Sequence, residues 1–353
     1  ENLSYYLKEI FPVVFNRLDE RLRYAWKSCW PESKPLSDED LPQLSFGSWV
    51  GGDRDGHPKV TAEVTRETLG YLRAHAMDVV NGHLFTLSRK LSFNPLDVDP
   101  PKALLDRLAE WKVEETGHAA WQSYVSALAD RLETGPDFLR SELLTLKSWL
   151  ETIGAHRIIE VDLSPLIRLI DAFGFHLARL DVRQNSDYYE KALTQMMVAA
   201  GIPEAEDYPA WPTARKLTFL GSELTHSRPL THPSMDLPAE AREVRATFME
   251  LAHHRDRYGV EGIGALIISM TRNVADLLTV YVLGKEVGLT HFVDGRLVCD
   301  FPVVPLFETY DDLEAAPAII DALLGHPCAR TSLGKTPDGR PVMMIMLGYS
   351  DSN

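Results

Sequence analysis

Five short apolar runs, separated by segments long enough to hold helices, are the feature that most constrains the fold of this sequence. They span residues 44–50, 177–182, 265–270, 303–307 and 342–347. Strands that are buried on both faces of a parallel sheet have such continuous apolar sequences, whereas half-exposed strands alternate apolar and polar residues. Helical segments separate the last three runs, which is the strand–helix–strand order of parallel sheets and barrels. The sequence therefore predicts an α/β fold built on part of a parallel sheet or barrel.

Helical periodicity dominates the rest of the chain. Over residues 61–91 apolar residues recur at steps of three and four, which predicts one long amphipathic helix. Residues 142–152 and 186–200 show the same pattern. The Pro-rich, polar stretches 94–101 and 203–213 are expected to be loops. We therefore expect a predominantly α-helical protein around the sheet.

Capping residues mark the ends of two further helices. Asn273, with Asp276 three residues later, has the spacing of an N-cap with a capping box, and Gly288 is expected to close the helix that follows. Another helix is predicted from Asp311 to residue 324, where Gly325 stops it. Both helices lie between apolar runs, as the parallel-sheet interpretation requires.

Charge and composition exclude several classes of protein. The chain has 51 Asp and Glu against 36 Lys and Arg, a net charge of −15, so we expect neither nucleic acid nor an anionic membrane as a partner. No apolar stretch approaches the roughly 18–20 residues of a membrane span. The three cysteines are far apart and form no CxxC pair, which favours a cytoplasmic protein. The chain begins without Met and stops just after its last apolar run, so we expect a piece of a longer protein.

Polar residues follow each apolar run, at positions where a buried core would not require them. They are residues 51–56, 183–186, 269–272, 308–309 and 349–352. In a parallel α/β barrel the active site forms at the carboxyl ends of the strands. The pattern therefore predicts that arginines and carboxylates from five strands meet at one rim.

Glu308 and Asp351 are candidate metal ligands, because carboxylates without neighbouring His or Cys suit Mg²⁺ or Mn²⁺. The alternative is that each carboxylate caps the helix that follows it. Arg183 is a candidate guanidinium fork for a carboxylate or phosphate group. Its alternative partner is a neighbouring carboxylate such as Asp181, and the sequence leaves both alternatives open.

Five segments of the sequence resemble signature segments of the phosphoenolpyruvate carboxylase family. The first reads Phe-Gly-Ser-Trp-Val-Gly-Gly-Asp-Arg-Asp-Gly-His-Pro-Lys-Val-Thr, and the five segments are 46–61, 180–186, 268–270, 304–309 and 347–352. They occur in the order found in the family and extend over most of the chain. Members of the family are much longer at both ends. We therefore expect residues 1–353 to be one partial domain of this family, without an internal boundary.

The resemblance implies a largely helical protein around an eight-stranded α/β barrel of the TIM type. It implies a lyase that forms oxaloacetate and phosphate from phosphoenolpyruvate and bicarbonate, an anaplerotic carbon dioxide fixation that supplies the tricarboxylic acid cycle. The implied cofactor is Mg²⁺ or Mn²⁺, and the implied assembly is a homo-oligomer, commonly a tetramer. The alternative is a non-catalytic relative that binds an anionic metabolite or a protein partner.

The resemblance also assigns roles to residues of this chain. Glu308 and Asp351 match the carboxylates that hold the metal, and Arg183 matches an arginine that contacts the substrate. A separate set of residues matches the bicarbonate/CO₂ pocket, namely Trp49, Leu306 and Met346. The catalytic histidine of the family falls before residue 1, and its catalytic lysine and mobile glycine-rich loop fall after residue 353. The isolated chain is therefore expected to be inactive.

The sequence departs from the resemblance at two places. Asn185 stands where the family commonly has an acidic residue, and residues 271–276 differ from the small-residue, Pro-containing version of its best-known members. These departures mark a divergent branch of the family and bear on regulation and on the substrate.

Overall fold

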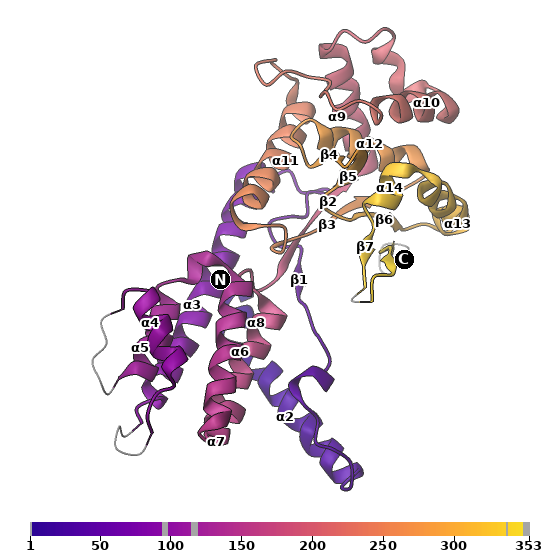
Figure 1. Ribbon diagram of the computed structural model, residues 1–353. Helices are drawn as coiled ribbons and strands as arrows, with labels where there is room; N and C mark the ends of the chain where they lie inside the picture. Colours follow the sequence, from indigo (N-terminus) through magenta and orange to yellow (C-terminus); the bar gives the residue numbers. More distant parts are fainter. Residues whose placement is uncertain (1, 94–97, 114–118, 337, 349–353) are drawn as a thin grey trace. The chain divides into compact units, whose positions relative to one another are not determined.

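The computed structural model describes residues 2–93, 98–113, 119–336 and 338–348 (Figure 1). The chain divides into two compact units, the first comprising residues 1–46 and 70–178 and the second residues 47–69 and 179–353. Each unit has buried apolar side chains of its own. No helix within the described ranges is both long and apolar enough to span a membrane.

The second unit contains a five-stranded sheet in which all neighbouring strands are parallel. Its order is β1 (Gly47–Ser48), β2 (Arg179–Asn185), β3 (Ile263–Ser269), β6 (Val303–Phe307) and β9 (Met346–Leu347). Each of the five predicted runs contributes one strand, and the order in the sheet equals the order in the chain. The prediction of a parallel α/β sheet is confirmed, as a curved half barrel. The first and last strands are shorter than predicted, and each lies at an edge of the sheet with one neighbour among the described strands.

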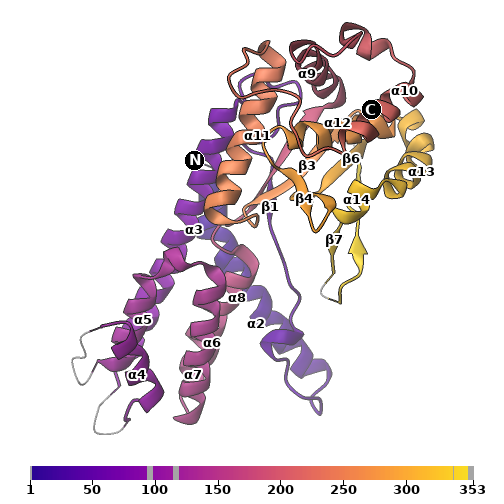
Figure 2. The same cartoon turned by 45° about the horizontal axis from the view of Figure 1, so that its top comes forward.

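Helices surround this sheet, and α12 (Val274–Lys285) is the most enclosed of them (Figure 2). Every residue of α12 is buried, which explains why its sequence is apolar on all sides instead of amphipathic. The remaining elements of the unit are α9 (Ser186–Ala199), α10 (Thr213–Glu223), α11 (Ala239–Tyr258), α13 (Tyr310–Gly325), α14 (Pro327–Thr331), β4 (Thr290–Val293), β5 (Arg296–Cys299), β7 (Gly334–Lys335), β8 (Pro341–Val342) and a 3₁₀ turn at Ala205–Ala210.

Local capping determines where these helices begin, as the sequence predicted for α12. The side chain of Asn273 accepts a hydrogen bond from the backbone of Ala275, and Asp276 completes the capping box. A second capping box, which the sequence analysis missed, joins Thr309 to Asp312 at the start of α13. The expected loop at 203–213 is partly wrong, because backbone hydrogen bonds three residues apart turn its centre into the 3₁₀ turn. An antiparallel hairpin, β4–β5, also lies between α12 and β6.

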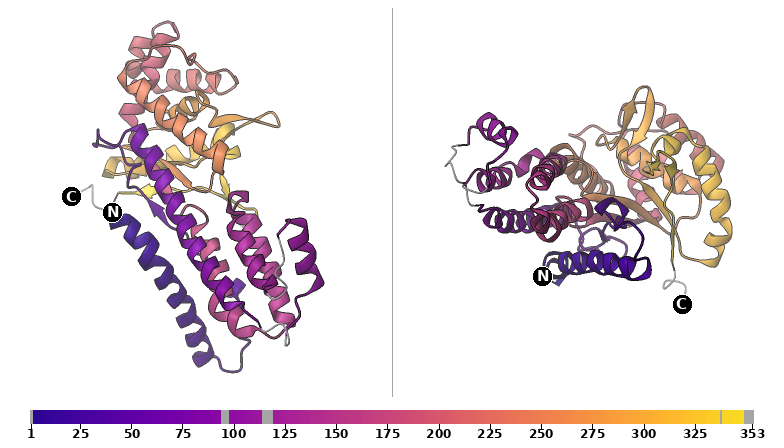
Figure 3. Two further views of the ribbon diagram at one scale, coloured as in Figure 1. Left: turned by 90° about the vertical axis from the view of Figure 1, so that its left-hand side faces the viewer. Right: turned by 60° about the horizontal axis from the view of Figure 1, so that its bottom comes forward.

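The first unit is helical, and its long helices α6 (Pro136–Thr152) and α8 (Ser164–Phe173) lie side by side (Figure 3). The long helix predicted over 61–91 is confirmed as α3 (Ala62–Lys90), whose residues up to 69 belong to the other unit. The other elements are α1 (Asn2–Tyr5), α2 (Phe11–Cys29), α4 (Lys102–Glu110), α5 (Ala120–Ala129), α7 (His156–Ile158), π-helical turns at Tyr6–Ile10 and Ile159–Leu163, and 3₁₀ turns at Asp38–Asp40 and Leu132–Thr134.

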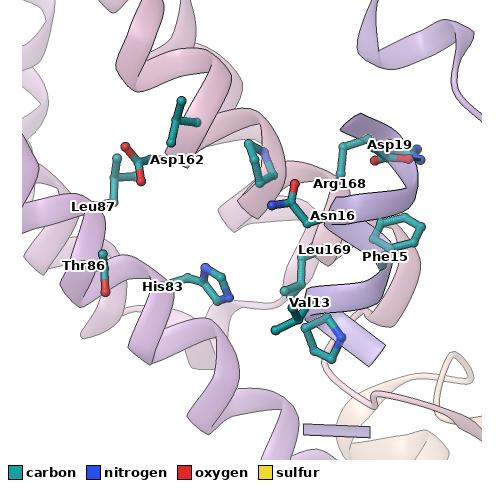
Figure 4. A pocket seen from close by; sticks show the side chains of 13 residues that line it. Val13, Phe15, Asn16, Asp19, His83, Thr86, Leu87, Asp162, Arg168 and Leu169 are labelled. Atoms are coloured by element: carbon teal, nitrogen blue, oxygen red, sulfur yellow. Dashed lines mark hydrogen bonds and ion pairs between the residues drawn. The ribbon is translucent and has the colours of Figure 1, made fainter. Parts of the chain in front are cut away.

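A buried ion pair joins α2 to α8 within this unit. The guanidinium of Arg168 donates to both carboxylate oxygens of Asp19, at 2.9 and 3.1 Å, and to the carbonyl of Pro42 at 2.9 Å. Both side chains are about 95% buried. Figure 4 shows the pair on one side of a hollow of about 290 Å³, with His83 and Asp162 across it. Each buried charge is therefore satisfied only while the other is present.

We expect Asp19→Ala to lower the free energy of unfolding by about 3–5 kcal/mol, because it leaves the Arg168 guanidinium buried without its counter-charge. Glu20→Ala, at the exposed neighbouring position of α2, is the matched control and is expected to change stability by less than about 0.5 kcal/mol. Urea unfolding followed by circular dichroism measures both. Equal effects for the two variants would contradict a structural role for the pair.

Candidate active site

The loop after β1 continues alongside β2 and places its charged residues beside Arg183. The backbone N–H of Arg183 donates to the carbonyl of Gly52 at 3.0 Å, and the N–H of Arg54 donates to the carbonyl of Arg183 at 2.9 Å. Asp53 pairs with Arg183 as a parallel β-bridge. A Cβ atom at Gly52 would overlap the carbonyl oxygen of Asp181, so this close approach of two backbones requires glycine.

Three carboxylates surround the guanidinium of Arg183. One Nη atom lies 3.0 Å from Asp55 and 3.2 Å from Glu308, and the other lies 3.8 Å from Asp53. The Arg183 side chain is 15% exposed, and its buried Nε atom has no hydrogen-bond partner in the part of the chain that the structure describes. Three negative charges against one positive charge leave the cluster with an excess of negative charge. A cation or a rearrangement around a ligand would relieve that excess.

Arg183 forms ion pairs with carboxylates, as its alternative role from the sequence expected, but the partners are Asp55 and Glu308 and not Asp181. The Asp181 carboxylate accepts hydrogen bonds from the indole Nε1 of Trp49 at 3.1 Å and from the backbone N–H of Ala265 at 2.8 Å. The register of β2 against β3 shifts next to Asp181. A Cβ at Gly264 would overlap the carboxylate. At this irregularity the backbone N–H of Ala265 therefore donates to a side-chain oxygen of Asp181, and not to a backbone carbonyl of the neighbouring strand.

Glu308 follows β6 and does not cap a helix, so the capping alternative is wrong for this residue. The N-cap of α13 is Thr309, whose side chain accepts from the backbone of Asp312. Glu308 instead accepts from the backbone N–H of Met270 at 2.8 Å, and its side chain is 7% exposed. Met270 adopts a left-handed φ of 54°, which costs about 1–2 kcal/mol in a non-glycine residue. The strained backbone therefore holds an N–H directly against the Glu308 carboxylate.

The three residues matched to the bicarbonate/CO₂ pocket come together at one apolar cluster. Leu306 belongs to a buried group on neighbouring strands, and Trp49 and Met346 pack against that group. The Trp49 ring lies 5.3 Å from the Arg183 guanidinium. The other members of the buried group are Ala265, Ile267 and Val304. The charged cluster and the apolar cluster thus adjoin each other through Trp49 and Arg183.

Arg54 is a residue that the sequence analysis did not single out, and it anchors the loop. Its guanidinium is buried and donates to the carbonyls of Gly52 and Thr61, each at 3.3 Å, and to the hydroxyl of Thr65. Burial lowers the pKa of Arg54 below its usual value. The available signal was a lone Arg between two Asp residues in a glycine-rich turn. The charged residues of this loop therefore have different partners. Arg54 contacts the loop's own backbone, whereas the two aspartates face Arg183.

Of the two predicted metal ligands, Glu308 lies within the described residues. Asp351, with residues 349–352, lies outside the described residues. Within the described ranges no group of three or more His, Cys, Asp and Glu side chains could hold a metal ion. Glu308 nevertheless presents the hard oxygen donors that Mg²⁺ and Mn²⁺ take.

A curved parallel sheet covered by helices, with Arg183 inside β2 near its carboxyl end and carboxylates just after β1 and β6, defines a class of α/β protein with a site at that edge. The chain matches the family model of phosphoenolpyruvate carboxylase over residues 1–131 and 110–353. It therefore belongs to the phosphoenolpyruvate carboxylase family.

Individual relatives agree with this assignment. The chain is 36% identical over 376 residues to the phosphoenolpyruvate carboxylase of Methylorubrum extorquens, in an alignment that covers 98% of this chain and 40% of that protein. It is 34% identical to the enzyme of that name from Rhodothermus marinus, with 98% and 41% covered, and 38% identical to that from Rhodopseudomonas palustris, with 88% and 35% covered. The chain thus spans about two fifths of the length of these relatives.

The glycine at position 52 provides a test of the loop geometry. We expect Gly52→Ala to lower the free energy of unfolding by about 1–3 kcal/mol, because the new methyl group must displace the Asp181 backbone. Gly70→Ala, at an exposed helical position with open space for a Cβ, is expected to raise it by about 0.5–1 kcal/mol. Thermal or urea unfolding of both variants shows whether each substitution lowers or raises the free energy of unfolding. A stabilising Gly52→Ala would contradict the close approach of the loop to β2.

Proposed function

We propose that this chain is part of an enzyme that forms oxaloacetate and phosphate from phosphoenolpyruvate and bicarbonate, using Mg²⁺ or Mn²⁺. The observation that carries the proposal is the position of Arg183, which faces Asp53, Asp55 and Glu308 and has one buried N–H without a partner among the described residues. A buried donor without a partner is rare in proteins and favours a ligand at that place. The reaction itself is proposed because the chain belongs to the phosphoenolpyruvate carboxylase family.

Some residues of this chain would bind and neutralise charge, and others would exclude water from the site. Arg183 would bind an anionic group of phosphoenolpyruvate through its guanidinium, releasing the contacts it makes with Asp55 and Glu308. Glu308 and Asp351 would hold the divalent ion, which neutralises developing negative charge when bound. Trp49, with the apolar cluster around Leu306, would shield a neutral CO₂ molecule and the carbanion-like enolate from water.

The proposed reaction has two stages. A bicarbonate oxygen bonds to phosphorus while the phosphorus–enol oxygen bond breaks, which gives carboxyphosphate and the enolate of pyruvate. Carboxyphosphate then breaks down to phosphate and CO₂, and the enolate carbon forms its new bond to CO₂. Arg183 would stabilise charge on the phosphoryl group in the first stage. The apolar cluster would act in the second stage, since protonation of the enolate competes with carboxylation.

We further propose that the five strands are part of an eight-stranded barrel whose other strands lie outside this sequence. The five-stranded half barrel leaves β1 and β9 with one neighbour each, and a closed barrel has no such edges. The proposed assembly is a cytoplasmic homo-oligomer, as in the family.

The chain alone is expected to form no oxaloacetate, because the family's catalytic histidine and lysine match positions outside residues 1–353. A malate dehydrogenase coupled assay with phosphoenolpyruvate, bicarbonate and Mg²⁺ measures this. The longer protein that contains this sequence is expected to turn over in the same assay. Turnover by the chain alone would contradict the proposed division of catalytic residues, and an inactive longer protein would favour the non-catalytic alternative.

In the longer protein, Glu308→Gln is expected to cut kcat by at least about 100-fold or to raise the Mn²⁺ concentration required. The amide keeps an acceptor for the Met270 N–H but loses the charge that holds a cation, so the melting temperature without metal should change little. Glu314→Gln, at an exposed position of α13, is the matched control. Unchanged kcat and metal dependence in Glu308→Gln would remove the metal role.

Arg183→Lys is expected to raise KM for phosphoenolpyruvate, because an ammonium cannot reproduce the guanidinium fork.

A further inference from the structure

A second hollow in the unit that carries the sheet lies away from the residues around Arg183. It has a volume of about 890 Å³ and is lined by the end of α10, the β4–β5 hairpin and α14 with the residue before it. Figure 1 shows α14 next to β5. Its volume is within the range of sites for small organic ligands, which is roughly 300–1,000 Å³. None of its lining residues belongs to the candidate active site.

The charges that line this hollow are all positive. Arg296 and Arg330 face it, and neither side chain forms a hydrogen bond or ion pair with any residue in the described ranges. Among the residues that the structure describes, no carboxylate lines it. The hollow of the helical unit, in contrast, is lined by two carboxylates, Asp19 and Asp162, as well as by Arg168. In a chain with a net charge of −15, two unpaired guanidiniums without a neighbouring acid make a local site for an anion.

Rigid elements hold the two arginines at the hollow. Arg296 follows the two-residue turn Asp294-Gly295, whose φ angles of 49° and 74° are those of a type I′ hairpin. The helix that carries Arg330 is tied to the same hairpin, because the backbone N–H of Cys299 donates to the hydroxyl of Ser332 at 2.8 Å. The backbone positions that carry the two arginines are therefore fixed relative to each other before any ligand binds, although both side chains are exposed.

His326 adds a neutral donor to the lining. Its Nδ1 accepts a hydrogen bond from the backbone N–H of Cys328 at 3.3 Å, so in the neutral ring the proton is on Nε2. Burial lowers the pKa of His326, which keeps the ring neutral at pH 7. An Nε2–H donor is then available to an acceptor oxygen.

The remaining wall of the hollow is apolar. Phe292 contributes an aromatic ring, and Leu224 and Leu297 contribute aliphatic side chains. A bare inorganic anion would leave this surface in water, whereas an organic anion would cover it. We propose that the hollow binds a phosphate monoester with an apolar or planar organic group, its phosphate held by Arg296 and Arg330. The proposal does not rest on the proposed function, since it uses no residue of that site.

Isothermal titration calorimetry on this chain tests the proposal with adenosine 5′-monophosphate, inorganic phosphate and adenosine as probes. We expect the monophosphate to bind more tightly than phosphate, and adenosine to bind least. The double variant R296Q/R330Q is expected to weaken binding of the monophosphate at least about 10-fold. Arg340→Gln makes the same charge change at an exposed arginine outside the hollow and should leave binding unchanged.

A measurement on the unaltered chain keeps the test independent of whether the variants fold. Phenylglyoxal modifies accessible arginines, and peptide mass spectrometry locates the modified residues. We expect adenosine 5′-monophosphate to protect Arg296 and Arg330 but not Arg340. Binding that survives in R296Q/R330Q and is lost in Arg183→Gln would place the ligand at the active site and overturn the proposal, as would the absence of protection at Arg296 and Arg330.

Discussion

The candidate site depends on one constraint, the close backbone pairing of the loop after β1 with strand β2. The hydrogen bonds that link Gly52 and Arg54 to the backbone of Arg183 bring Asp53 and Asp55 to the guanidinium. The parallel register then adds Glu308, because β6 ends at the same edge of the sheet as β2. Without the pairing, three carboxylates of like charge would have no reason to gather, since their mutual repulsion opposes it.

Two side chains that do not face a substrate stabilise this arrangement. Arg54 donates hydrogen bonds to carbonyls of its own loop. The carboxylate of Asp181 accepts hydrogen bonds from the indole of Trp49 and from the backbone N–H of Ala265. The two carboxylate bonds of Asp181 couple the indole beside Arg183 to the irregular register of β3. The left-handed backbone at Met270 likewise orients Glu308, because it directs the Met270 N–H at the Glu308 carboxylate. The site is thus oriented largely by backbone groups, which move less than side chains and hold a preorganised geometry.

Charge is distributed unevenly in this acidic chain, and the distribution separates its two candidate binding places. Around Arg183 the carboxylates outnumber the cation, which is the charge balance expected at the proposed metal site. Among the described residues, the hairpin hollow is lined by two arginines and no carboxylate, which favours a monoester on its own. A net charge of −15 therefore describes neither place, because ligands respond to the few charges within a Debye length of about 8–10 Å.

The sequence by itself determined the strands, most helices, the capping box at Asn273 and the polar edge of the sheet, because periodicity, capping and the ends of apolar runs are local patterns. It also named Trp49, Leu306 and Met346, through resemblance. Only the tertiary structure decided which partner each charge has: Arg183 could pair with Asp181 two residues away, but it pairs with residues more than 120 positions distant. Such pairings follow from strand register and from a bulge, and no local pattern encodes the register between strands so far apart in the chain.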